Sequence, residues 1–244
     1  MTPFDVYAPE HLLLFCLAAA LAGFIRGFAG FAGPAIVSLL LAHFFVPATL
    51  LPRIILLDFY AYPMLLRSVR HGADWKLSIP MAVATIALLP FGLEIMQTVE
   101  PATLKRMIGI ACLAAIAVSL TGFRFRRLPP WWVNVPVAGA LGLVLSSTFI
   151  ALPLVTYFFM LPLSAVACRA TVLSFTVMVI PCMAFWVFSS GLVQLEDVLP
   201  VALAGALYFA MIYLGSRAFE RSGGAHYRQV VQWLLVLLSG AVMF

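Results

Sequence analysis

The chain has 244 residues, of which 64% are hydrophobic and only 9% are charged, whereas soluble globular domains average roughly 25% charged residues. Its 14 Lys and Arg and 9 Asp and Glu residues are too few to cover the surface of a water-soluble protein of this length. Composition therefore excludes a soluble protein and predicts an integral membrane protein. The apolar runs are continuous rather than alternating, which favours spanning helices over a strand barrel.

In chain order, the apolar runs predict ten helical segments, at residues 11–25, 34–46, 50–66, 77–97, 105–121, 134–148, 151–164, 167–190, 198–215 and 228–244. A helix needs about 20 apolar residues to cross a bilayer. Two adjacent pairs have members shorter than this: 11–25 with 34–46, and 134–148 with 151–164. We expect each pair to be a hairpin or a broken helix.

The break in the first pair is rich in glycine and closes with Pro34, which suits the first turn of a new helix. The break in the second pair closes with Pro153. In both, a glycine stands 11 positions before the proline. The glycines of the first break are Gly23, Gly27, Gly30 and Gly33, and the matching stretch of the second break carries Gly142, Ser146, Ser147 and Thr148.

These matching breaks predict an internal duplication, with a transmembrane repeat at 1–122, a basic cytoplasmic linker at 123–133 and a second repeat at 134–244. Loops rich in Lys and Arg face the cytoplasm. Nine such residues lie in three loops, and only Lys105 and Arg106 lie in loops on the other side. The fold class predicted is an all-α membrane protein with two inverted repeats of about five helical segments, each with a broken or hairpin helix pair at its centre, and with both termini outside the cytoplasm. The nine Lys and Arg residues of the three loops expected in the cytoplasm are Arg67, Arg70, Lys76, Arg124, Arg126, Arg127, Arg217, Arg221 and Arg228.

Four charged residues fall within the expected membrane segments: Arg26, Arg53, Asp58 and Arg169. A charge at the centre of a membrane helix costs about 2.5–3.5 kcal/mol on insertion scales, so each needs a reason. For Arg53 and Arg169 the alternative to a binding role is snorkelling to the interface. For Arg26 it is an ion pair with Asp58, which could instead take part in proton coupling.

Three arginines against one aspartate make a positive interior, and the helix N-termini after the two breaks would add backbone donors for an anion. Gly/Pro-interrupted segments in matching positions of inverted repeats point to the midplane site of a secondary transporter; the alternative is that the glycines only let helices pack closely. The predicted substrate-binding residues are Arg26, Gly27, Gly30, Gly33, Pro34, Arg53, Ser146, Ser147, Thr148 and Arg169.

Catalytic chemistry is disfavoured, because the sequence shows no paired acidic motif, nucleotide-binding loop or Ser/His/Asp pattern. The histidines have no metal-ligand partner at useful spacing, and the cysteines lie inside apolar runs. We therefore expect no enzyme activity, no cofactor, no metal and no nucleic-acid partner. The expected partners are a small anion and the lipid bilayer.

The glycine-rich break closed by Pro34, its counterpart ending at Pro153 and the C-terminal run from Leu214 to Gly240 resemble the sulfite exporter TauE/SafE family. The resemblance covers nearly the whole chain, although Ser146, Ser147 and Thr148 depart from the usual glycine-rich second break. It implies a multi-pass transporter of small anions such as sulfite, sulfoacetate and other organosulfonates.

The function predicted is secondary export of such a sulfur oxyanion, bound at the midplane between the two repeats and moved by alternating access. An anion-selective channel and a carrier of small carboxylates are the alternatives. The expected location is the cell membrane, in the bacterial inner membrane.

Overall fold

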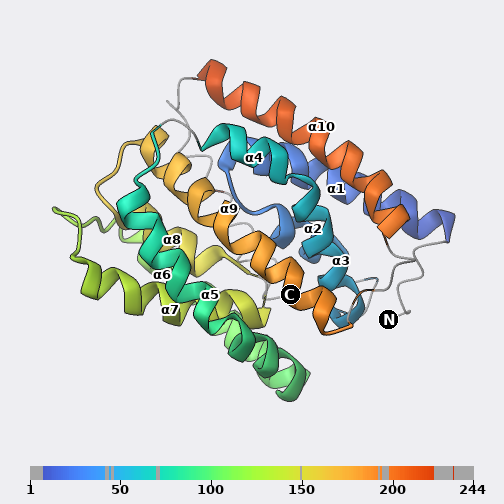
Figure 1. Cartoon of the computed structure of the whole chain (residues 1–244), viewed down its shortest axis with the longest axis horizontal. Coiled ribbons are helices and arrows are strands. Elements are labelled where there is room, and N and C mark those ends of the chain that lie inside the picture. Colours follow the sequence, from blue (N-terminus) through green and yellow to red (C-terminus); the bar gives the residue numbers. More distant parts are fainter. Residues whose placement is uncertain are drawn as a thin grey trace. The chain divides into compact units, whose positions relative to one another are not determined.

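The computed structural model describes residues 8–41, 44, 47–69, 72–148, 150–191, 193, 198–222 and 233, and these residues form helices and no strand (Figure 1). The all-helical prediction is therefore confirmed for the part of the chain described. The helices are α1 (Pro9–Ala29), α2 (Gly33–Leu41), α3 (Pro47–Tyr60), α4 (Tyr62–Ser68), α5 (Trp75–Thr98), α6 (Pro101–Leu120), α7 (Trp131–Thr148), α8 (Leu152–Met160), α9 (Ala165–Ser189) and α10 (Val198–Ser222).

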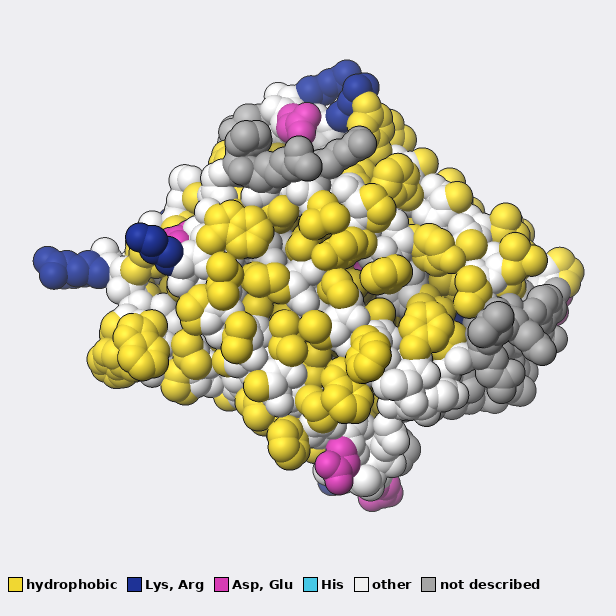
Figure 2. Space-filling view, in the orientation of Figure 1, with side chains coloured by type: hydrophobic (Ala, Val, Ile, Leu, Met, Phe, Trp, Pro, Cys, Tyr) yellow, Lys and Arg dark blue, Asp and Glu magenta, His cyan; other side chains and the backbone are white. Residues whose placement is uncertain are grey.

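Within the described residues, α1, α5, α7, α9 and α10 are long and apolar enough to cross a membrane. Large hydrophobic side chains are exposed on them, for example Leu13, Val83, Phe185 and Leu199, each more than half exposed. Hydrophobic side chains cover most of the face shown in Figure 2. An apolar exterior of this kind is what a lipid environment requires.

Eight of the ten expected segments correspond to one helix each, and the tenth, 228–244, lies outside the described residues apart from Trp233. The single segment expected at 50–66 is wrong, because it is two helices, α3 and α4, separated at Ala61. The Ala61 N–H donates to the Asp58 carbonyl at 3.2 Å and the helix restarts at Tyr62. Pro63 stands in the first turn of α4, so the sequence did contain a sign of this new helix start.

Both breaks are shorter than the sequence suggested. Helix α1 continues through Gly23 and Gly27 to Ala29, and α7 continues to Thr148. The expectation that α1 and α7 are too short to span alone is therefore wrong: each is long and apolar enough. The glycines stay helical because neighbouring helices pack tightly against them. Each long helix is followed by a nine-residue helix, α2 or α8, with its proline in the first turn.

The described residues cluster into two compact units. The first comprises α1, α2, α3, almost all of α4, the end of α9 from Ile180, and α10. In it α1 and α10 pack along each other, α2 packs on both α1 and α3, and α3 also contacts α10. This arrangement brings the first break close to the last turn of α3, at Asp58, and to the middle of α10, at Tyr208.

The second unit comprises α5, α6, α7, α8 and α9 as far as Val179. Its main contact is between α5 and α7, and α8 packs on both α6 and α7. Asp74 begins α5 by accepting a hydrogen bond from the Leu77 N–H at 3.2 Å, a typical N-cap. The Asp74 N–H in turn donates to the Thr171 hydroxyl at 3.1 Å, which ties the start of α5 to α9.

Candidate functional site

The first break is a three-residue stretch, Gly30 to Ala32, in which the backbone twice enters the left-handed region. Gly30 ends α1 at φ 87°, and its N–H donates to the Arg26 carbonyl at 2.7 Å. Ala32 has φ 76°. A residue with a Cβ is uncommon there, and the strain costs about 1–2 kcal/mol. The conformation is retained because Phe31 and Ala32 are buried in the first unit.

Directly before this break, Arg26 forms a buried ion pair with Asp58 of α3. Its Nη2 donates to Asp58 Oδ2 at 2.9 Å, and its Nε lies 2.7 Å from Oδ1. The Arg26 and Asp58 side chains are 3% and 7% exposed. The pair that the sequence left open is thus present, and it balances one buried charge with another.

Tyr208 of α10 completes this cluster by donating its hydroxyl to Asp58 Oδ1 at 2.9 Å. Tyr208 is among the largest fully buried side chains of the described residues. The three groups come from α1, α3 and α10, and Tyr208 lies 150 positions from Asp58 in the sequence. Asp58 therefore holds together three helices of the first unit.

Gly33, the first residue of α2, lies directly against this cluster. A Cβ there would overlap the Tyr208 hydroxyl and would come within 2.7 Å of Arg26 Cδ. Only a glycine lets the start of α2 approach the Arg26 side chain and the Tyr208 ring this closely. The structure thus brings Arg26, Gly33 and Asp58 together and adds Tyr208.

The remaining glycines of the first break have packing roles. A Cβ on Gly27 would overlap the Ile212 backbone of α10, and a Cβ on Gly23 would lie 2.6 Å from the Tyr208 carbonyl oxygen. On the facing side, a Cβ on Gly215 would overlap the Phe24 carbonyl of α1. Close backbone approach through small residues is a common way for membrane helices to associate. The contacts of Gly23 and Gly27 therefore agree with the alternative that these glycines let helices pack closely.

The second break follows three hydroxyl side chains at the end of α7, all of them buried. Each donates its hydrogen to a carbonyl of its own helix: Ser146 to Gly142 at 2.9 Å, Ser147 to Leu143 at 2.8 Å and Thr148 to Val144 at 2.6 Å. To donate to an anion, these hydroxyls would first have to rotate away from the helix.

Two of these residues also shape the second unit. The Thr148 oxygen accepts a hydrogen bond from the Ile150 N–H at 3.2 Å, which satisfies the backbone where α7 ends. Ser146 packs against Gly92 of α5, where a Cβ would overlap its hydroxyl. Gly142 similarly faces Thr85, whose hydroxyl donates to the Ala138 carbonyl at 3.0 Å.

The other predicted site residues, and Pro153 at the second break, lie on α2, α3, α8 and α9. Pro34 is half-buried in the first turn of α2, and Pro153 is buried in the first turn of α8. Arg53 is half-buried on α3. Arg169 is 8% exposed on α9, in the second unit. Arg26 and Arg53 belong to the first unit.

Chemically, the described residues offer buried guanidinium groups, those of Arg26 and Arg169. They contain no group of three or more His, Cys, Asp or Glu side chains that could hold a metal. The Arg26 Nε lies 2.7 Å from Asp58 Oδ1 and its Nη2 lies 2.9 Å from Asp58 Oδ2, so both carboxylate oxygens contact this guanidinium.

Tyr208 is the residue that sequence reasoning missed. It is a polar side chain in the middle of an apolar span, three positions after Gly205. A buried tyrosine hydroxyl usually finds a hydrogen-bond partner, so its position was a usable signal. The sequence did not indicate that Asp58 is its partner, because the two residues are 150 positions apart.

Comparison with known proteins identifies a protein family. No curated protein and no solved structure matches the chain. The family model described as "Sulfite exporter TauE/SafE" matches residues 15–242, which include both breaks and all of the buried charges described above. The chain therefore belongs to the TauE/SafE sulfite exporter family of membrane transporters.

Proposed function

We propose that this chain is a secondary transporter that exports a small sulfur oxyanion, sulfite or an organosulfonate such as sulfoacetate. Family membership supports anion transport. The proposal adds a substrate class and a mechanism, alternating access of two inverted repeats around a midplane site.

The observation that carries the substrate class is the sign of the buried charge. The buried charged side chains of the described residues are Arg26, Arg169 and Asp58, so the interior is net positive. A bound anion would offset that excess, and a guanidinium presents a planar fork of donors that fits sulfonate or sulfite oxygens. Arg169, buried on α9 of the second unit, is the guanidinium group that we assign to substrate binding and test below.

Transport by purified protein in proteoliposomes tests the proposal. Uptake of sulfite or sulfoacetate should saturate with concentration. It should also accelerate when the vesicles are preloaded with the same anion, because the binding site of a carrier must reorient to the outside after each release and can do so with anion bound. Flux that never saturates and lacks this stimulation would instead show a channel. Small carboxylates that compete as well as sulfonates would show a broader carrier.

Arg169 is tested by replacing it with alanine and with lysine. Arg169→Ala should abolish saturable uptake, whereas Arg169→Lys should retain part of it with a raised KM, because lysine keeps the charge and loses the planar fork. Arg106→Gln, an exposed arginine at the start of α6, is the matched control. Unchanged uptake by Arg169→Ala would remove Arg169 from the site.

A further inference from the structure

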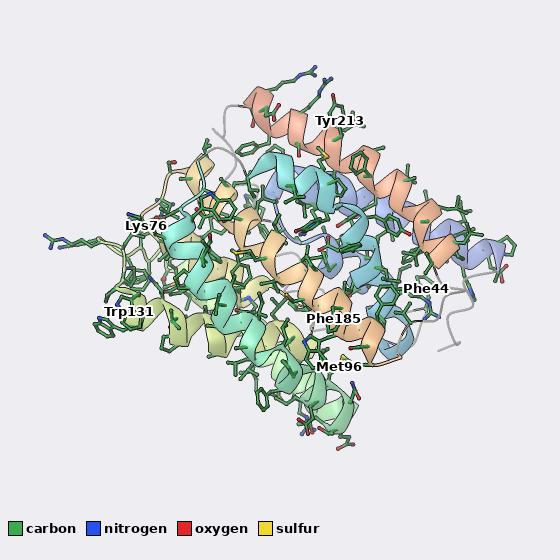
Figure 3. All side chains as sticks on the ribbon, in the orientation of Figure 1. Phe44, Lys76, Met96, Trp131, Phe185 and Tyr213 are labelled. Carbon is green, nitrogen blue, oxygen red and sulfur yellow. The ribbon has the colours of Figure 1, made fainter. Side chains whose placement is uncertain are left out.

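The connection between α6 and α7 carries an exposed surface that the proposed function does not use. Three arginines within four positions are exposed there, and four large hydrophobic side chains flank them. We refer to these seven residues as the basic–aromatic surface: Phe123, Arg124, Arg126, Arg127, Leu128, Trp131 and Trp132. Trp131 and Trp132 are 72% and 63% exposed, and Trp131 projects away from the ribbon at the start of α7 (Figure 3).

The backbone of this surface is fixed by Phe125, which lies between Arg124 and Arg126 and contacts α8. The Phe125 N–H donates to the Met160 carbonyl at 2.9 Å. The Phe125 ring packs edge-on against the Tyr157 ring of α8, with 6.1 Å between the ring centroids. It also packs edge-on against the Phe123 ring, with 5.3 Å between the centroids. The connection is thus fixed to the C-terminal part of α8, and the exposed arginines take no part in fixing it.

A second set of hydrogen bonds fixes the start of α7 to the same helix. The Tyr157 hydroxyl donates to Asn134 Oδ1 at 2.5 Å, and Asn134 Nδ2 donates to the Pro129 carbonyl at 2.7 Å. Asn134 is buried. The basic–aromatic surface and α8 therefore belong to one continuous hydrogen-bonded and ring-packed assembly in the second unit.

We infer that the basic–aromatic surface binds the anionic headgroups of membrane lipids. Through the contact between Phe125 and Tyr157, this binding holds α8 in the position that transport requires. The lipid-binding part stands alone. The effect on transport rests on the proposed function, in which α8 follows the second break.

Charge and position both favour lipid as the occupant. The sequence contains no Asp or Glu between residues 101 and 195, so no nearby carboxylate on this connection competes for the arginines. The surface lies at the N-terminal end of α7, a candidate membrane span, and tryptophan side chains prefer the membrane interface. Each basic residue close to an anionic membrane adds roughly fivefold to the affinity.

Lipid binding to the purified full-length chain in neutral detergent is the direct test, with phosphatidylglycerol and phosphatidylcholine as probes and native mass spectrometry as the readout. We expect the wild type to prefer phosphatidylglycerol. Arg124→Gln with Arg126→Gln and Arg127→Gln should weaken its binding on the order of 100-fold. The corresponding triple lysine variant should retain it within a few-fold, and Arg106→Gln should leave it unchanged.

Equal binding of the two lipids, or an unchanged preference in the triple Gln variant, would overturn the inference. Displacement of the lipid by millimolar inorganic phosphate would overturn it as well, since it would show a site for free phosphate. The regulatory part is tested by saturable uptake in vesicles with and without 30% phosphatidylglycerol. Uptake that ignores the lipid while binding persists would refute only that part, and absence of uptake in every lipid would refute the proposed function instead.

Discussion

Asp58 joins three helices of the first unit, because two buried side chains from other helices converge on its carboxylate. A buried ion pair adds little net stability over a well-packed apolar alternative, but the loss of one partner is expensive. Arg26 and Asp58 therefore each make the other necessary. Tyr208 has a smaller share, since it contributes one hydrogen bond to a charged acceptor.

Breaking the ion pair from one side should cost more than removing both charges. We expect Arg26→Gln and Asp58→Asn each to destabilise the protein by about 3–5 kcal/mol, because each leaves a buried charge without its counterion. The double variant should cost clearly less than the sum. Unfolding free energies in mixed micelles measure this cycle, and strictly additive costs would contradict a direct coupling between the two residues.

Tyr208→Phe should lower the unfolding free energy by about 1.5–3 kcal/mol, the usual value for a hydrogen bond to a charged group. The ring, and with it the packing against Gly23 and Gly33, is retained. Tyr213→Phe on the same helix is the matched control, because Tyr213 is 43% exposed. Equal melting temperatures for the two variants in detergent would show that the Tyr208 hydroxyl contributes nothing to stability.

At the scale of the elements, α1 and α10 pack through glycines that allow backbone to lie against backbone. Gly27 meets the Ile212 backbone, and Gly215 meets that of Phe24. The pair formed by α5 and α7 is looser at one position, because a Cβ on Gly139 would meet only Leu88 Cδ1, at 3.1 Å. The same residue type thus has different tolerance in the two helix pairs.

Gly27→Ala and Gly139→Ala should therefore behave differently. Gly27→Ala forces α1 away from α10 and should cost about 1–3 kcal/mol or more. Gly139→Ala requires only that the flexible Leu88 side chain shift, and alanine gains up to about 1 kcal/mol of helix propensity. The net effect on stability should therefore be close to zero. Melting temperatures of the two purified variants provide the comparison. A tolerated alanine at Gly27 would mean that this contact is not tightly packed.

The position of most helices could be predicted from apolar runs alone, and so could the first-turn prolines Pro34 and Pro153. The extent of the breaks could not be predicted. Gly23 and Gly27 look like helix breakers in the sequence, but α10 holds them in a helix, and that contact joins residues about 190 positions apart. The Arg26–Asp58 pair was one of two alternatives, because the sequence does not show which residue of another helix lies against Asp58.

At the scale of the whole molecule, the loops divide by charge. Arg124, Arg126 and Arg127 are exposed between α6 and α7, whereas Glu100 is exposed between α5 and α6. Positively charged loops remain in the cytoplasm during insertion. Since α5 is long enough to cross a membrane, the loops at its two ends should lie on opposite sides.

Single cysteines can test this orientation. In a variant free of native cysteines, we expect Glu100→Cys and Ser190→Cys to react with a membrane-impermeant maleimide in intact cells. Ala73→Cys and Phe123→Cys should react only after permeabilisation, because their loops carry the arginines. All four positions are described as loop residues outside the helices, so reaction of every variant after permeabilisation provides the control for accessibility.

The two possible failures of this test have different meanings. A fully reversed pattern would keep α5 as a span but place the arginine-rich loops outside, which would contradict the positive-inside assignment. Reaction of Ala73→Cys and Glu100→Cys from the same side would mean that α5, between them, does not cross the bilayer. That second result would also exclude five segments per repeat, because an odd number of crossings is what inverts the second repeat relative to the first.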